Sequence, residues 1–204
     1  MVTKVDRLVY NRRMIASSRN RPGQRPARER ILLTAHDLFY REGIRATGVD
    51  RLIAESSVAK LTFYRHFASK NDLVQAYLTH RHNTWMTWFT QTLAQHQSRR
   101  RPAWKALPPT LAEWFDQPAF RGCAFINAAV ELGAALPEVA VACREHKVAM
   151  TGVIATLLPP SRLRQRQAGT VACAVDGAIV RAQLDASGKN AVDALERLLD
   201  AILG

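Results

Sequence analysis

Cysteine is scarce in this sequence, and long apolar runs are missing. The 204 residues include three cysteines, Cys123, Cys143 and Cys173, which lie 20 and 30 residues apart. This spacing provides neither a disulfide framework nor a CxxC metal or redox motif, and it favours a reducing compartment. No apolar run approaches the ~18 residues of a membrane span, and the first residues lack the apolar stretch of a secretion signal. We therefore expect a cytoplasmic protein without a membrane segment.

Motifs of common enzymes and cofactor sites are also missing. The sequence has no GxSxG, P-loop or GxGxxG pattern. The histidines of the body, His80, His82, His96 and His146, fit no paired spacing for metal ligands. The sequence therefore predicts a protein that is not an enzyme and that uses no metal or cofactor.

Positive charge is abundant, with 29 Lys and Arg against 17 Asp and Glu and a net charge of +12. Residues 1–70 hold 15 of these cations and 6 of the acids, so most of the excess lies in the first third of the chain. The apolar content of 48% indicates a folded protein rather than a basic tail. The asymmetry predicts an N-terminal module that binds a polyanion, either nucleic acid or an anionic membrane surface.

Residues 1–27 are the most basic stretch, and they contain Lys4 and six arginines. Pro22, Gly23 and Pro26 disfavour a helix there, so we expect a disordered basic arm. Such an arm can follow a DNA backbone or enter a minor groove, and it can equally be a solvated leader without a partner. Both interpretations stay open at this point.

Three short helices are expected over residues 28–70. In the first, Ile31, Ala35, Leu38 and Phe39 share one face, and Gly43 ends the helix. The second is expected to start at a Thr47 hydroxyl cap and to end near Ser56, with a buried side formed by Val49, Leu52 and Ile53. The third covers 59–67, and Phe63 and Phe67 are its core residues. Ser69 to Asp72 then caps a fourth, longer helix.

Two stretches of this region resemble a known family. The segment TGVDRLIAESSVAKLTFYRHFASKNDLV, preceded by ARERILLTAHDLFYREG, resembles the helix-turn-helix signature of the TetR family of transcriptional regulators. The resemblance implies that residues 59–66 form a recognition helix in the DNA major groove. It implies base contacts for Lys60, Leu61 and Thr62 and backbone contacts for Thr47, Tyr64, His66 and Lys70.

Other roles are open for some of these residues. His66 could cover the helix end, and Thr62 could donate to a carbonyl one turn back. The turn between the second and third helices usually carries glycine in the family, and here it carries Ser57. A left-handed backbone at a serine costs on the order of 1 kcal/mol, which a packed core can offset.

Beyond residue 70 the periodicity is helical throughout, and proline-containing breaks separate the segments. Helices are expected over about 69–97, 103–116, 122–135, 138–157, 162–186 and 190–203. With the first three they make an all-α protein of about nine helices. We expect a helix-turn-helix DNA-binding domain over 28–70 and a larger C-terminal helical domain for ligand binding and dimerisation over 71–204.

Aromatic residues are concentrated between positions 85 and 125, where all four tryptophans lie. This density is consistent with the wall of a ligand cavity or with an ordinary helical core. The segment RGCAFINAAVELG also resembles a ligand-domain helix in one branch of the family, and Asp176 is an isolated acid in an apolar run. The candidate ligand-binding residues are Trp85, Trp88, Phe89, Trp114, Phe115, Cys123, Phe125, Asn127, Glu131 and Asp176.

Alternatives remain for the polar members of this set. Glu131 and Asp176 could face solvent on amphipathic helices, and Cys123 could be a small buried hydrophobe instead of an oxidant sensor. The last two helices are rich in Ala, Val and Leu. In the family such helices pair with those of a second copy, and they could equally complete the core of the monomer.

The sequence thus predicts a TetR-type regulator, a repressor that binds a palindromic operator in double-stranded DNA as a homodimer. A partly apolar small-molecule effector would release it. A helical ligand-binding protein or small enzyme, and a basic module for a membrane surface or a protein partner, are the alternatives.

Overall fold

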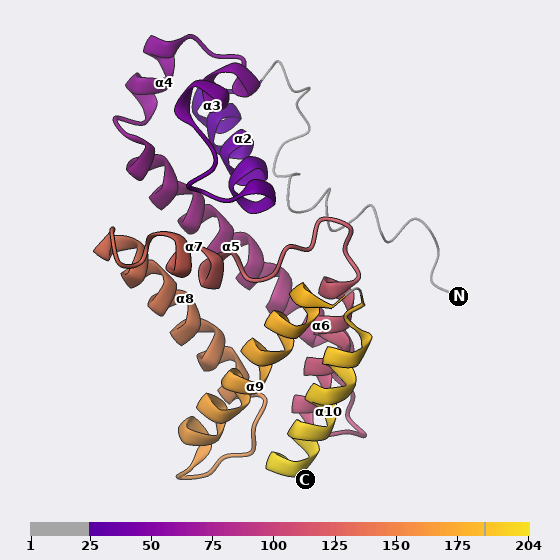
Figure 1. The fold of residues 1–204 in the computed structure, drawn as a ribbon. Coiled ribbons are helices and arrows are strands. Elements are labelled where there is room, and N and C mark those ends of the chain that lie inside the picture. The colour runs from indigo at the N-terminus through magenta and orange to yellow at the C-terminus, as the bar shows by residue number, and fades with distance from the viewer. Residues whose placement is uncertain (1–24, 186) are drawn as a thin grey trace. The chain divides into compact units, whose positions relative to one another are not determined.

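The fold is all-α throughout residues 25–185 and 187–204, which the computed structural model describes (Figure 1). These residues form nine α-helices and one 3-10 helix and contain no strand, which confirms the predicted fold class. All but the last three residues of the predicted basic arm lie outside the described residues. The elements are α2 (Ala27–Glu42), α3 (Val49–Ser56), α4 (Lys60–His66), α5 (Lys70–His96), η2 (Ala103–Ala106), α6 (Leu107–Phe115), α7 (Ala124–Leu132), α8 (Pro137–Thr156), α9 (Arg164–Leu184) and α10 (Lys189–Leu203).

Helix boundaries agree with the predicted segments to within a few residues. Gly43 ends α2 with a φ of 94°, as predicted. Ser69 caps α5, because its hydroxyl accepts a hydrogen bond from the Asp72 N–H at 3.1 Å and donates to the Asp72 carboxylate at 2.9 Å. Pro108 and Pro109, which lie inside the segment expected over 103–116, fall in the first turn of α6, where a missing N–H leaves no hydrogen bond unmade.

The chain divides into two compact units. The first contains the described residues up to 85 together with 127–142, and the second contains 86–126 and the described residues from 143 onward. The predicted domain boundary at residue 70 stays a prediction. None of the described helices is both long and apolar enough to cross a bilayer.

The core of the first unit is built from the faces that the periodicity predicts. Ile31, Ala35, Leu38 and Phe39 of α2 are all buried. Leu52 of α3 is buried too, whereas Val49 and Ile53 are only half-buried. Because α3 has eight residues, its stability depends on this packing.

A polar cluster lies buried in the same unit. The Arg81 guanidinium lies 4.0 Å above the Tyr40 ring and donates through Nη1 to Nε2 of His36 at 3.3 Å. Since arginine only donates, Nε2 of His36 is the acceptor and its Nδ1–H points at the Asp37 carboxylate, 3.2 Å away. Burial lowers the pKa of His36 and of His80, whose ring is edge-on to His36.

The turn between α3 and α4 contains a serine in the left-handed conformation. Ser57 has φ 52° and ψ 48°, and it is the one non-glycine residue with positive φ in the described part of the chain. Its N–H donates to the Ala54 carbonyl at 3.1 Å, which closes the C-terminus of α3. The left-handed conformation considered for Ser57 from the sequence is therefore the observed one.

Acidification is expected to destabilise the first unit. The folded pKa values of His36 and His80 lie below the ordinary value of 6.5, so the unfolded chain binds more protons. The free energy of unfolding therefore falls as pH drops through about 6.5, by up to about 1 kcal/mol per pH unit from His36. Urea unfolding between pH 7.5 and 5.5 measures this slope. It should become shallower in His36→Gln and stay unchanged in His66→Gln, an exposed control; equal slopes in all three proteins would contradict the assignment.

The substitution Ser57→Gly is expected to stabilise the protein. Glycine adopts positive φ without a Cβ clash, so the free energy of unfolding should rise by about 1 kcal/mol. Ser56→Gly is the matched comparison and should destabilise, because Ser56 lies inside α3 and donates to the Leu52 carbonyl at 2.6 Å. Urea unfolding of both variants checks the pair, and a loss of stability in Ser57→Gly would show that the turn carries no strain.

Candidate nucleic-acid interface

Helix α4 has one buried face and one exposed face. Phe63 is fully buried, and its ring lies 6.4 Å from that of Phe67, also buried, just after the helix. Leu61 on the other face is 73% exposed, which is unusual for leucine. A helix of seven residues is marginal by itself, so burial of Phe63 holds it in place and leaves the opposite face free for a partner.

The structure leaves four of the predicted DNA contacts on α4 exposed. Lys60, Leu61, Tyr64 and His66 are all exposed. The Tyr64 ring meets Phe63 edge-on at 5.4 Å, which fixes its direction. Thr62 is half-buried. A cation, an apolar group and two polar rings on one short helix are suited to a surface that carries both phosphates and base edges.

Two other predicted contacts have internal partners. Thr47 is fully buried, and its hydroxyl donates to the Gly43 carbonyl at 2.8 Å. The predicted Thr47 cap is therefore wrong, since Gly48 is the N-cap of α3 and makes no side-chain bond. Lys70 donates through Nζ to the Ile44 carbonyl at 2.6 Å, and burial lowers its pKa. Contact of both residues with the DNA backbone stays a prediction.

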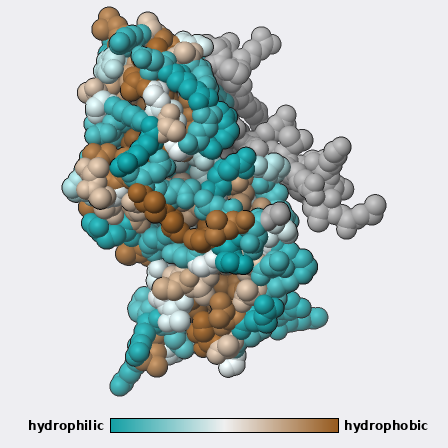
Figure 2. All heavy atoms as spheres, in the orientation of Figure 1, coloured by the Kyte–Doolittle hydropathy of each residue, from teal (hydrophilic) through white to brown (hydrophobic). Residues whose placement is uncertain are grey.

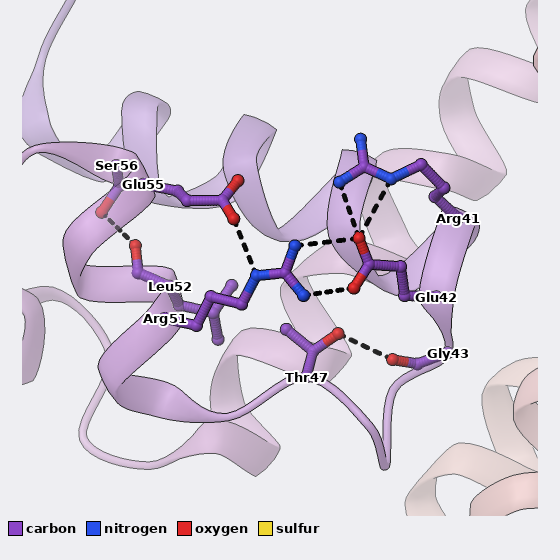
Figure 3. A network of polar contacts seen from close by, with 8 residues as sticks. All are labelled: Arg41, Glu42, Gly43, Thr47, Arg51, Leu52, Glu55 and Ser56. Carbon is purple, nitrogen blue, oxygen red and sulfur yellow. Dashed lines mark hydrogen bonds and ion pairs between the residues drawn. The ribbon is translucent and has the colours of Figure 1, made fainter.

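Two cations of the first unit, Arg41 and Arg51, are bound to acids on the same surface (Figure 3). The Arg51 guanidinium lies between two carboxylates, Glu42 of α2 and Glu55 of its own helix. Arg41 donates to Glu42 as well, at 2.7 Å. These hydrogen bonds, that of Arg51 first, lower the pKa of Glu42. Fewer cations of the unit are therefore available to bind a polyanion than its number of Lys and Arg residues suggests.

Other cations remain available. In the described part of the chain the side chains of Arg45, Lys60 and Arg65 make no ion pair, and all three are exposed. The sequence reasoning missed Arg45 and Arg65. The sequence does distinguish paired from unpaired arginines. Arg51 has an acid, Glu55, four residues later, whereas the positions four residues before and after Arg65 are Leu61 and Ser69, which cannot form an ion pair.

Several predicted ligand residues meet in the second unit. The ring centroids of Trp88 and Trp114 are 6.2 Å apart, and Phe120 meets Trp114 edge-on at 5.2 Å. Phe115 joins the same network, and Phe89 is fully buried. Phe125 stacks on His146 with centroids 3.6 Å apart. Trp88, Trp114, Phe115 and Phe120 thus form one aromatic network, which is consistent with either interpretation of the aromatic density.

The remaining predicted ligand residues lie elsewhere or have partners. Trp85, Asn127 and Glu131 belong to the first unit. Glu131 accepts a hydrogen bond from the Arg45 N–H at 2.8 Å. Asp176 forms an ion pair with Lys147 at 2.5 Å, so the compensating charge that an isolated acid needs comes from α8. Effector contact by these residues stays a prediction.

The cysteines differ in exposure. Cys123 and Cys143 are buried, and Cys173 is exposed on α9. The Cys143 thiol donates to the Phe125 carbonyl at 3.1 Å, and burial raises its pKa to about 11. That thiol is therefore a poor nucleophile at neutral pH. Over the described residues, no three His, Cys, Asp or Glu side chains come together as a metal site.

Comparison with known sequences identifies the helix-turn-helix region. Residues 31–77 match the model for "Bacterial regulatory proteins, tetR family". An HTH-type transcriptional regulator of Staphylococcus aureus is 35% identical over 71 residues, which are 35% of this chain and 38% of that protein. The chain therefore matches well under half the length of this curated relative.

Comparison with solved structures extends the likeness to most of the chain. A TetR-family transcriptional regulator from Streptomyces coelicolor has a TM-score of 0.75 and 29% identity, and the match covers 87% of this chain and 90% of that one. The reduced form of E. coli NemR has the same fold, with a TM-score of 0.73 and 20% identity over 85% of this chain and 96% of that one. On the matched helix-turn-helix and this shared fold, the chain belongs to the TetR family of bacterial transcriptional regulators.

Proposed function

We propose that the protein is a cytoplasmic repressor that binds a palindromic operator as a homodimer and is released by a small-molecule effector. The observation that carries the proposal is the exposed face of α4, which is held by the buried Phe63 and presents Lys60, Leu61 and Tyr64 together. A short helix supported in this way fits the major groove, where base edges differ most.

Contacts on this face divide by chemistry. Lys60 can donate to guanine acceptors, and the Leu61 side chain can contact a thymine methyl group. Thr62, half-buried on the same helix, is the third base contact that we propose. The Tyr64 hydroxyl and the His66 ring are proposed to bind phosphates, which sets the register of the helix on the duplex.

A second copy is proposed to pack on the outer face of α9. Gly169, Cys173, Gly177, Val180 and Leu184 follow one another at spacings of three or four residues, and all but the half-buried Gly169 are exposed. A Cβ built on Gly169 or Gly177 meets nothing within 4 Å. A helix from a partner can therefore approach closely, and a two-fold interface would place two recognition helices about 34–36 Å apart.

The effector is proposed to bind in the second unit beside its aromatic network. Trp88, Trp114 and Phe115 supply apolar surface, and Thr110 on α6 adds an unusual polar group. Its hydroxyl is fully buried without a hydrogen-bond partner among the described residues. A partly apolar compound with one polar group satisfies both features. It would lower operator affinity by its preference for one of two conformations.

Selection from genomic DNA tests the proposal directly. The purified protein is incubated with sheared DNA of its source organism at near-physiological salt, and the retained fragments are sequenced. Enrichment of one palindrome supports specific regulation. Uniform retention that disappears on modest addition of salt would reduce the protein to a basic helical module and refute the proposal.

The substitution Leu61→Ala is expected to change which fragments are selected. Its side chain is 73% exposed, so stability should stay within about 0.5 kcal/mol while base preference at the contacted position relaxes. Val148→Ala is the control, because Val148 is 71% exposed on α8, a helix that forms no part of the proposed interface. Identical fragment sets for the wild type and Leu61→Ala would show that α4 does not read the bases.

The substitution Gly177→Arg is expected to convert the dimer into a monomer. The arginine would occupy the close approach between two copies of α9 and bring like charges together. Gly152→Arg is a matched control, because Gly152 is also a helical glycine with open space at Cβ, but on α8. Light scattering after size-exclusion chromatography at micromolar concentration gives the masses. A dimer in Gly177→Arg would place the interface elsewhere.

A further inference from the structure

The loop between α2 and α3 is held by its backbone at three consecutive positions. The Gly43 carbonyl accepts from the Thr47 hydroxyl, and the Ile44 carbonyl accepts from Lys70 Nζ at 2.6 Å. The Arg45 N–H donates to Oε2 of Glu131 at 2.8 Å. The loop is thus hydrogen-bonded to Thr47 at its own end, to the start of α5 and to α7, all within the first unit.

Glu131 fits this loop closely. It lies 86 residues from Arg45 in the sequence, so the contact depends on the tertiary fold. The nearest atom to a Cβ built on Gly43 is Oε2 of Glu131, at 3.2 Å. Gly43 also has a positive φ of 94°, so it lacks a side chain for two independent reasons. A side chain at Gly43 would therefore require the Glu131 carboxylate to shift slightly.

Two opposite charges hold the loop. The Lys70 ammonium bonds a carbonyl, and the Glu131 carboxylate bonds the N–H of the next residue, so each charge meets the favourable end of a peptide dipole. Charge-assisted hydrogen bonds of this kind are stronger than neutral ones. Glu131 also counteracts the effect of burial on the pKa of Lys70, because its negative charge favours the ammonium form.

We propose that Glu131 and Lys70 are positioning residues for DNA binding, which act through the α2–α3 loop in place of the effector and phosphate contacts predicted for them from the sequence. This inference rests on the proposed function. The loop leads directly into α3, whose first residue is Val49, and α3 leads through the Ser57 turn into α4. Fixing the loop therefore fixes where the exposed face of α4 is presented.

The salt dependence of binding separates this role from a direct phosphate contact. A lysine that neutralises a phosphate adds about one unit to the slope of log affinity against log salt, and its removal subtracts that unit. A lysine that holds the loop changes affinity by the same factor at every salt concentration. Lys70→Met, which keeps most of the side-chain length, is expected to weaken binding with an unchanged slope.

The experiment measures fluorescence anisotropy of a labelled palindromic fragment recovered in the genomic selection, over a series of KCl concentrations. Glu131→Leu should lower affinity about tenfold at each concentration, because the Arg45 N–H loses its acceptor. Glu131→Gln keeps an acceptor oxygen and should recover most of the affinity. Glu138→Leu, an exposed acid on the neighbouring α8, should bind like the wild type.

Amide hydrogen exchange of Arg45 provides a second measurement without DNA. Exchange should be faster in Glu131→Leu than in the wild type, and Glu131→Gln should lie between them. Unchanged affinity in Glu131→Leu, or a slope reduced by about one in Lys70→Met, would overturn the positioning role while the regulator itself stands. A wild-type protein that selects no fragment refutes the regulator, and the positioning role with it.

Discussion

Burial of Phe63 is the contact on which the proposed DNA-reading face of α4 depends. Helix α4 has seven residues, too few to be stable in water, and this residue ties it to the core that α2 and α3 build. The same anchoring leaves Leu61 and Tyr64 facing outward, because positions i−2 and i+1 relative to Phe63 lie off the buried face of the helix. Support for the helix and exposure of its reading surface are thus two results of one packing arrangement.

The helices were predictable because their signals are local. Apolar spacing, Gly43 and the Ser69 cap each act within a few residues, and the structure follows them closely. The all-α class could therefore be inferred before any coordinate was known. The family resemblance predicted a recognition helix from equally local signals, since the matched pattern lies within residues 31–77.

Contacts between distant residues could not be predicted. Nothing in the sequence pairs Glu131 with Arg45 or Asp176 with Lys147, because such bonds depend on how helices pack. Thr47 shows that two local partners can compete for one hydroxyl. Its hydroxyl donates to the Gly43 carbonyl four residues earlier instead of capping α3, and Gly48 is the N-cap. Figure 2 shows that hydrophobic residues also lie on the surface. Hydropathy along the sequence does not distinguish these exposed residues from those of the core.

The exposed face of α4 has a consequence for how such proteins diverge. The most exposed of its side chains add little to the core, so exchanging them changes the free energy of unfolding by no more than about 0.5 kcal/mol. On the proposed function, the residues that distinguish one operator from another are then among those most tolerant of mutation. A duplicated gene can acquire a new set of target promoters through a few substitutions on this helix, with no compensating change elsewhere in the protein.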